Sequence, residues 1–119
     1  MAKSVALLIT KPPYGTEDAF AGIREAMALA VSGLVERTVV LLIGEGGLNA
    51  LTSQRPEALS MPSNLEAVND LLALEVETYV VKEDLDRILP DAELIEGVRP
   101  ISWDEARGII AEVDLVTTF

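Results

Sequence analysis

The chain has 119 residues, of which half are apolar and only 4% aromatic, so its core is built from aliphatic side chains. Cys and His are both absent, which excludes a disulfide framework, a thiolate metal site and a thiol nucleophile, and removes the commonest general base. Nine basic and 20 acidic residues give a net charge of −11, so we expect no nucleic-acid or anionic-membrane partner. This length predicts a single domain over residues 1–119.

Short apolar runs predict the strands. The first two runs are continuous rather than alternating, which is typical of strands that are covered on both faces, as in a parallel sheet. The five predicted strands are Val5–Ile9, Val39–Ile43, Val76–Val81, Ala92–Ile95 and Val113–Val116.

Helical patterns fill the intervals between these runs. Apolar residues at helical spacing predict a helix over Glu17–Gly33, and a shorter one is expected over Glu83–Leu89, ended by Pro90. Capping-box patterns begin two further helices, at Ser63 and at Ser102. Alternating strands and helices predict a three-layer α/β fold with a five-stranded, mostly parallel sheet flanked by helices.

The start of the chain shows no targeting signal. Residues 1–4 lead into an apolar run of five residues, Val5–Ile9, which is too short for a signal peptide or a membrane span. We therefore predict a cytoplasmic protein.

The first predicted helix is unusually apolar. Residues 26–31 are six consecutive apolar residues, so Met27, Ala28 and Val31 cannot all face the same sheet. A second chain would cover the remaining side, which predicts an oligomer with these three residues in its interface. The alternative is that alanine is present only as a good helix former.

The loop after the first strand is the first candidate binding site, because ligands collect at the carboxyl ends of parallel strands. Gly15 allows close approach, Thr16 is placed to cap the following helix, and Lys11 adds positive charge beside Tyr14. These residues suit a small anion. The alternative is a stiff turn made by Pro12, Pro13 and Gly15.

The loop after the second strand, residues 44–49, resembles a dinucleotide-binding fingerprint only superficially. Asn49 stands where the third glycine belongs, and Glu45 would repel a pyrophosphate. We therefore expect Gly46 to permit a sharp turn or a close backbone approach. Glu45, Gly46 and Asn49 remain candidate ligand or interface residues.

The third candidate loop begins at Lys82. Glu83 and Asp84 follow it and are most simply favourable charges at a helix start, although acids at this spacing also suit Mg²⁺. No second acidic cluster completes a ligand set, so we predict no metal and no cofactor.

Motifs in these loops resemble the DsrE/DsrF/TusC-like family. The resemblance includes the acidic–glycine loop at Glu45 and the Gln54-Arg55-Pro56 segment, and it extends to the strand and aromatic residue at the end of the sequence. The segments that carry it are residues 10–16, 22–30, 45–56 and 113–119. The middle segment is most similar to the DsrF/TusC branch.

This resemblance implies a small α/β subunit of a multi-subunit, often hexameric, complex that passes a persulfide between proteins, as in DsrEFH or TusBCD. In such complexes the sulfur-carrying cysteine lies shortly after the third strand of another subunit. Residues 80–83 contain no cysteine, and a persulfide requires a thiolate. The implied role is a non-catalytic subunit whose partners are its own copies, related small subunits or a cysteine-bearing sulfur carrier.

Two other functions stay open at this level. The chain would serve as a homo-oligomeric module that binds a small anion at its loops. Alternatively it would be an enzyme that uses carboxylates or Lys11, although no nucleophile–base pair is recognisable.

Overall fold

The computed structural model describes residues 3–14, 17–54 and 63–119. Its centre is an all-parallel, five-stranded sheet with the order β4-β3-β2-β1-β5. The strands are β1 (Ser4–Ile9), β2 (Arg37–Leu42), β3 (Glu77–Val81), β4 (Arg99–Ile101) and β5 (Leu115–Thr118). The helices are α1 (Asp18–Ser32), the 3₁₀ helix η1 (Gly44–Ala50), α2 (Asn64–Ala73), α3 (Lys82–Ile88) and α4 (Trp103–Glu112).

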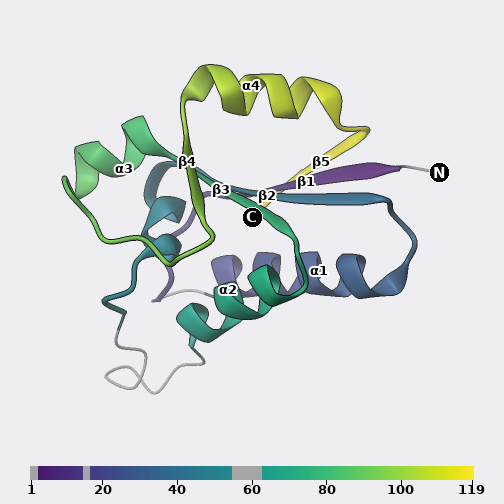
Figure 1. Ribbon diagram of the computed structural model, residues 1–119, viewed down its shortest axis with the longest axis horizontal. Helices are drawn as coiled ribbons and strands as arrows, with labels where there is room; N and C mark the ends of the chain where they lie inside the picture. The colour runs from purple at the N-terminus through teal and green to yellow at the C-terminus, as the bar shows by residue number, and fades with distance from the viewer. Residues whose placement is uncertain (1–2, 15–16, 55–62) are drawn as a thin grey trace.

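Helices cover both faces of this sheet, which confirms the predicted three-layer α/β fold. Helices α1 and α2 lie on one face and α4 lies on the other (Figure 1). Neighbouring residues of β1 therefore enter different cores: Val5 packs with the cluster under α1 and α2, whereas Ala6 packs with the cluster under α4. This is why the strand is a continuous apolar run.

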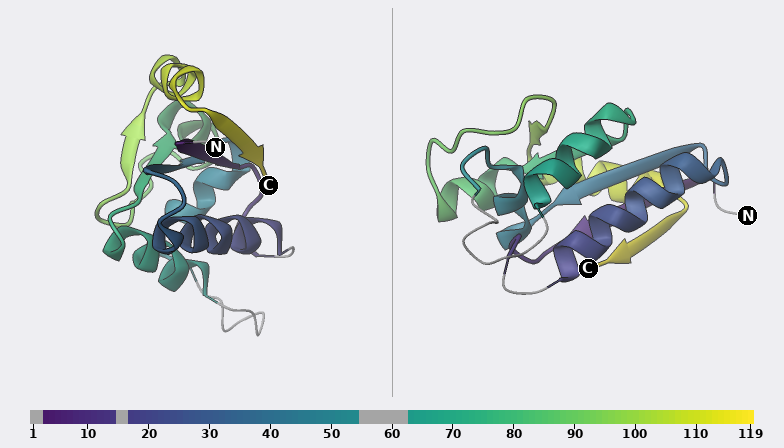
Figure 2. Two further views of the ribbon diagram at one scale, coloured as in Figure 1. Left: turned by 90° about the vertical axis from the view of Figure 1, so that its right-hand side faces the viewer. Right: turned by 90° about the horizontal axis from the view of Figure 1, so that it is seen from below.

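The strand order explains why α4 is alone on its face. The chain adds β2, β3 and β4 successively on one side of β1, then crosses to place β5 on the other side. Right-handed crossovers that move in opposite directions put their helices on opposite faces of a parallel sheet. The two sheet edges, β4 and β5, therefore lie far apart, as the left panel of Figure 2 shows.

A cap forms at both of the predicted capping boxes, complete at Ser102 and with one of its two hydrogen bonds at Ser63. The hydroxyl of Ser63 accepts a hydrogen bond from the N–H of Glu66 at the start of α2. At α4, Ser102 and Glu105 make both halves of a capping box. Gly33 ends α1 with φ at 73°, a left-handed conformation that favours glycine.

The predicted fourth strand, residues 92–95, is wrong. That segment runs beside η1 instead, where Leu94 makes an antiparallel bridge with Leu51 and the N–H of Ile95 donates to the carbonyl of Ala50. The fourth strand is β4, which contains Pro100. Proline lacks a ladder N–H and is tolerated at an edge position, so neither composition nor alternation indicated this strand.

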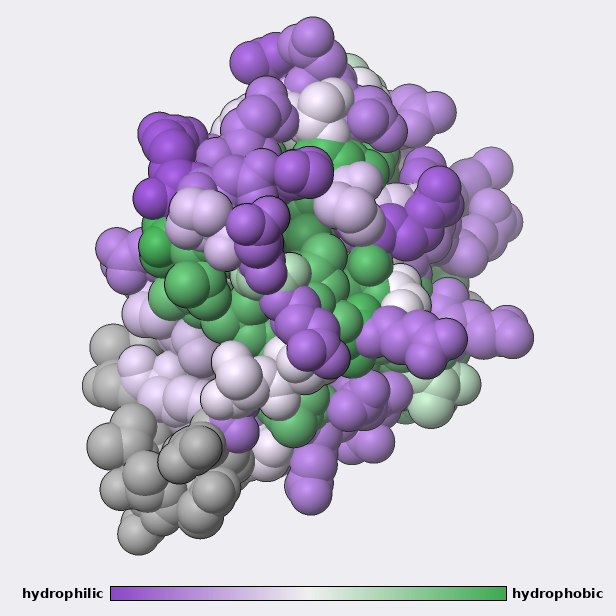
Figure 3. Space-filling model, turned by 60° about the vertical axis from the view of Figure 1, so that its left-hand side comes forward, coloured by the Kyte–Doolittle hydropathy of each residue, from purple (hydrophilic) through white to green (hydrophobic). Residues whose placement is uncertain are grey.

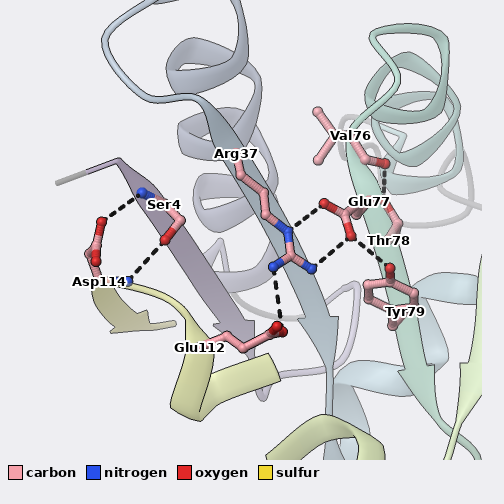
Figure 4. A network of polar contacts seen from close by, with 8 residues as sticks. All are labelled: Ser4, Arg37, Val76, Glu77, Thr78, Tyr79, Glu112 and Asp114. Atoms are coloured by element: carbon pink, nitrogen blue, oxygen red, sulfur yellow. Dashed lines mark hydrogen bonds and ion pairs between the residues drawn. The ribbon is translucent and has the colours of Figure 1, made fainter. Parts of the chain in front are cut away.

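A polar network joins the amino ends of β2 and β3 (Figure 4). Arg37 donates from Nε and Nη2 to the two carboxylate oxygens of Glu77, at 2.7 and 2.9 Å. Glu77 also accepts from the hydroxyl of Tyr79. The hydrogen bond from Arg37 holds the pKa of Glu77 below its usual value, and burial together with the bond to Glu77 raises the pKa of Tyr79.

Helix α1 is the longest of the described helices, and it has 15 residues. In the described part of the chain, no helix combines the length and apolarity that crossing a bilayer requires.

Candidate functional site

The three candidate loops meet at one end of the sheet, because the carboxyl ends of parallel strands all lie there. We call this end, formed by residues 10–14, η1 and the start of α3, the carboxyl edge, as distinct from the edge strands β4 and β5. Residues 10–14 leave β1, η1 leaves β2, and α3 begins directly after β3. Gly46 and Asn49 are buried there, Tyr14 is half-buried, and Lys11, Glu45 and Lys82 are exposed. Gly15 and Thr16 lie outside the described residues, so the predicted cap and close approach stay predictions.

Asn49 is the centre of a buried hydrogen-bond cluster. Its Nδ2 donates to the carbonyl oxygens of Lys11 and Gly46, both at 3.0 Å. Its Oδ1 accepts from Nδ2 of Asn64 at 2.8 Å. The side chain that replaces the third glycine of a dinucleotide fingerprint therefore ties the β1 loop, η1 and the start of α2 together.

Tyr14 extends this cluster through Gln54. The Tyr14 hydroxyl donates to Oε1 of Gln54 at 2.9 Å and accepts from the backbone N–H of Asn64 at 3.1 Å. Nε2 of Gln54 donates to the carbonyls of Asn49 and Leu51. Tyr14 and Asn49 thus belong to one hydrogen-bond cluster, and their polar atoms bond within the protein.

Gly46 makes the close backbone approach that the sequence predicts. A Cβ on Gly46 would lie 1.8 Å from the carbonyl oxygen of Ile9, so only glycine fits. The N–H of Ile43 donates to that same carbonyl. The end of β1 is therefore held against the start of η1 by direct backbone packing.

Asp84 also lies at this end of the sheet, and it does more than place a favourable charge at the start of a helix. Its buried carboxylate accepts from the N–H of Gly44 and from Nε1 of Trp103, both at 2.8 Å, and from Nη2 of Arg87 at 2.6 Å. One carboxylate thus connects the starts of η1, α3 and α4. No sequence signal indicated the contact with Trp103, which lies 19 residues away along the chain.

The side chain of Lys82 bonds outside the Asn49 cluster. Its ammonium donates to Asp86 at 2.6 Å, and this hydrogen bond raises the pKa of Lys82. Lys82 and Asp86 line a small groove of about 210 Å³ whose other walls include Leu85, Leu94 and Pro100. Figure 3, which brings the α3 side forward, shows apolar side chains there surrounded by polar ones.

The predicted interface helix buries only one side within its own chain. Ala26 and Ile23 are fully buried, Met27 is half-buried, and Ala28 is exposed. Val31 is 68% exposed, the most exposed large hydrophobic side chain among the described residues. The fold thus covers α1 on its sheet side, and cover for Ala28 and Val31 stays a prediction.

Comparison with known proteins identifies the class. The model of the DsrE/DsrF-like family matches residues 3–119, and the chain belongs to that family. It is 27% identical over 114 residues to a Methanocaldococcus jannaschii protein, MJ0989, covering 95% of this chain and 96% of that one. Its fold is similar to that of the ychN protein of E. coli, with a TM-score of 0.88, 24% identity, and coverage of 98% and 99% of the two chains. The resemblance to the family is confirmed at this level.

Proposed function

We propose that this chain is a non-catalytic subunit of a sulfur-relay-type complex, of the DsrF/TusC kind, that works by docking a cysteine-bearing partner. Membership of the DsrE/DsrF-like family supports the sulfur-relay part of this proposal. The observation that carries the role is at the end of β3, where Val81 is followed by Lys82 and no residue of the chain is a cysteine. Without a thiolate the chain cannot hold a persulfide, so the sulfur must reside on a partner.

The hydrogen bonds at the carboxyl edge support a docking role over a catalytic one. The buried amide of Asn49 and the buried carboxylate of Asp84 both bond within the protein. Asn49 donates both of its side-chain N–H groups within the protein, and both oxygens of Asp84 accept internal hydrogen bonds, so neither side chain can turn towards a substrate without breaking these bonds. The edge is therefore built to be rigid, which suits a surface that a partner recognises.

A second candidate is a homo-oligomeric module that binds a small anion. The exposed position of Lys11 beside the β1 loop favours it, because an ammonium at the edge attracts anions from solvent. The net charge of −11 opposes it. This candidate predicts that phosphate or a nucleotide raises the melting temperature, and that Lys11→Ala abolishes the rise.

Co-purification from the native host tests the proposal. We expect the tagged chain to bring down a related small subunit that contains a cysteine, and the captured thiolate to take up labelled sulfane sulfur from a persulfide donor, whose own thiolate is released. Recovery of the chain without any such subunit would contradict the proposal. A thermal shift with anions in that case would favour the second candidate.

A further inference from the structure

The two edges of the sheet are protected very differently. Edge strand β4 exposes Arg99 and Pro100, a charge and a proline of the kind that natural sheets use to prevent further pairing. Edge strand β5 has the sequence Leu-Val-Thr-Thr over residues 115–118, without a charge or a proline. Leu115 is 53% exposed and Val116 is 38% exposed. An exposed, apolar and uncharged edge of this kind is a ready template for pairing with another strand.

The outer backbone groups of β5 are positioned for such a strand. The N–H of Phe119 donates to the carbonyl of Leu8 at 2.8 Å, and the N–H of Thr10 donates to the carbonyl of Phe119 at 2.9 Å. In a parallel ladder only alternate residues bond to a given neighbour. The peptide groups of Val116 and Thr118 therefore point away from β1, towards the outer side of the sheet.

An apolar groove continues this edge towards α1, which lies beside β5 in the right panel of Figure 2. The groove has a volume of about 400 Å³ and runs between Leu115 and Phe119 on one side and Leu29 and Leu34 on the other. Leu34 is 63% exposed. Among the described residues that line it, Glu25 is the one with a charged side chain.

We infer that β5 pairs antiparallel with β5 of a second copy of this chain, about a two-fold axis perpendicular to the sheet. Such an axis makes identical strands antiparallel and keeps both α1 helices on the same face of the joined sheet. The two grooves then lie side by side and cover the exposed side chains of Leu34 and Leu115. One interface thus satisfies the open backbone groups and buries the apolar face together.

The charge distribution favours a second copy over a different partner. A chain of net charge −11 attracts basic proteins wherever its surface is acidic and repels its own copies there. The β5 edge carries no charge, and a single carboxylate, that of Glu25, lines the groove. This nearly neutral, apolar face is thus the part of an otherwise acidic surface where two copies can meet without like-charge repulsion. This inference goes beyond the proposed function, since it concerns only how the chain meets its own copy.

Single-cysteine variants provide the first test, because a protein without cysteine gives each variant one thiol per chain. Cysteines are placed in turn at Leu115, Val116, Thr117 and Thr118, and Arg99→Cys at the other edge is the control. Near a two-fold axis a residue faces its own equivalent, so mild oxidation should give a covalent dimer several-fold faster at one of the four positions than at residue 99. Equal rates at both edges would overturn the inference.

The mass in solution provides the second test. Wild-type protein should sediment as an even number of 12.8-kDa chains, and Val116→Lys should halve that number because a charge at the edge prevents strand pairing. Leu74→Lys, at an exposed apolar residue of the α2 end, is the matched control and should leave the mass unchanged. A wild-type monomer, or a Val116→Lys variant that unfolds normally and keeps the wild-type mass, would overturn the inference. Loss of sulfur partners without loss of the dimer would refute only the proposed function.

Discussion

The carboxyl edge of the sheet and the face formed by α1 and β5 differ in how their groups are satisfied. At the carboxyl edge, Asn49 and Asp84 are buried and bonded within the chain. On the α1–β5 face, Val31, Leu34 and Leu115 are more than half exposed. The polar groups of the first region are therefore bonded within the chain, whereas the exposed apolar surface lies at the second region. The comparison teaches that association is expected where apolar side chains are left exposed rather than where the buried polar groups gather.

A charge introduced on the α1–β5 face should have the largest effect of the changes considered. Ala28→Glu on α1 should remove about 3–5 kcal/mol of association free energy, because an unpaired carboxylate would be buried between chains. Light scattering measures the resulting drop in mass. Ala111→Glu, at an exposed alanine of α4, is the control and should keep the wild-type mass. An unchanged mass for Ala28→Glu would show that the face is not an interface.

Gly46 tests how tightly the carboxyl edge is packed. Gly46→Ala should lower the free energy of unfolding by roughly 3 kcal/mol or more, since its Cβ would overlap the carbonyl oxygen of Ile9. Gly108→Ala in α4 meets open space and should raise that free energy by about 0.5–1 kcal/mol. Urea unfolding measures both, and equal effects would refute the close backbone packing.

Asp84 tests the bond network of the same edge. Asp84→Asn replaces an acceptor by a donor that faces Gly44 or Trp103, so the free energy of unfolding should fall by about 2 kcal/mol. Asp86→Asn removes only the exposed partner of Lys82 and should cost less than about 0.5 kcal/mol. Tryptophan fluorescence during unfolding measures both variants, because Trp103 contacts Asp84. If the two variants cost the same, Asp84 does not hold the edge together.

The smallest effect is expected far from both regions, at Glu77. Its pKa is lowered in the folded protein, so its ion pair with Arg37 stabilises the fold above the normal pKa of a glutamate and loses that effect as pH falls through the lowered value. Glu77→Gln should cost about 0.5 kcal/mol at neutral pH and nothing in acid. Urea unfolding at several pH values measures this, with exposed Glu96→Gln as the control. A cost that persists in acid would contradict the ion-pair explanation.

Much of the fold could be predicted because the central strands and two of the helices are marked by local features of the sequence, namely apolar runs and capping residues. The runs at Val5–Ile9 and Val39–Ile43 identify the central strands, and the capping residues Ser63 and Ser102 begin α2 and α4 as expected. The two edge strands were harder to predict from the sequence. Strand β5 begins at Leu115 rather than Val113, and β4 contains Pro100, because edge strands are defined by pairing on one side rather than by their own composition.

The site was predicted by location rather than by role. The carboxyl edge does bring Tyr14, Gly46 and Asn49 together, as the parallel topology requires. Sequence could not show that Asn49 bonds to Asn64, or that Asp84 bonds to Trp103, because these partners are 15 and 19 residues apart. Only the three-dimensional arrangement reveals that these polar groups form hydrogen bonds within the chain.

Native mass spectrometry of the tagged chain from its own host tests the central claim, that this protein acts by association. We predict a complex that contains an even number of copies of the 12.8-kDa chain, together with a related small subunit that carries a cysteine. A single chain of 12.8 kDa with no companion would contradict the account.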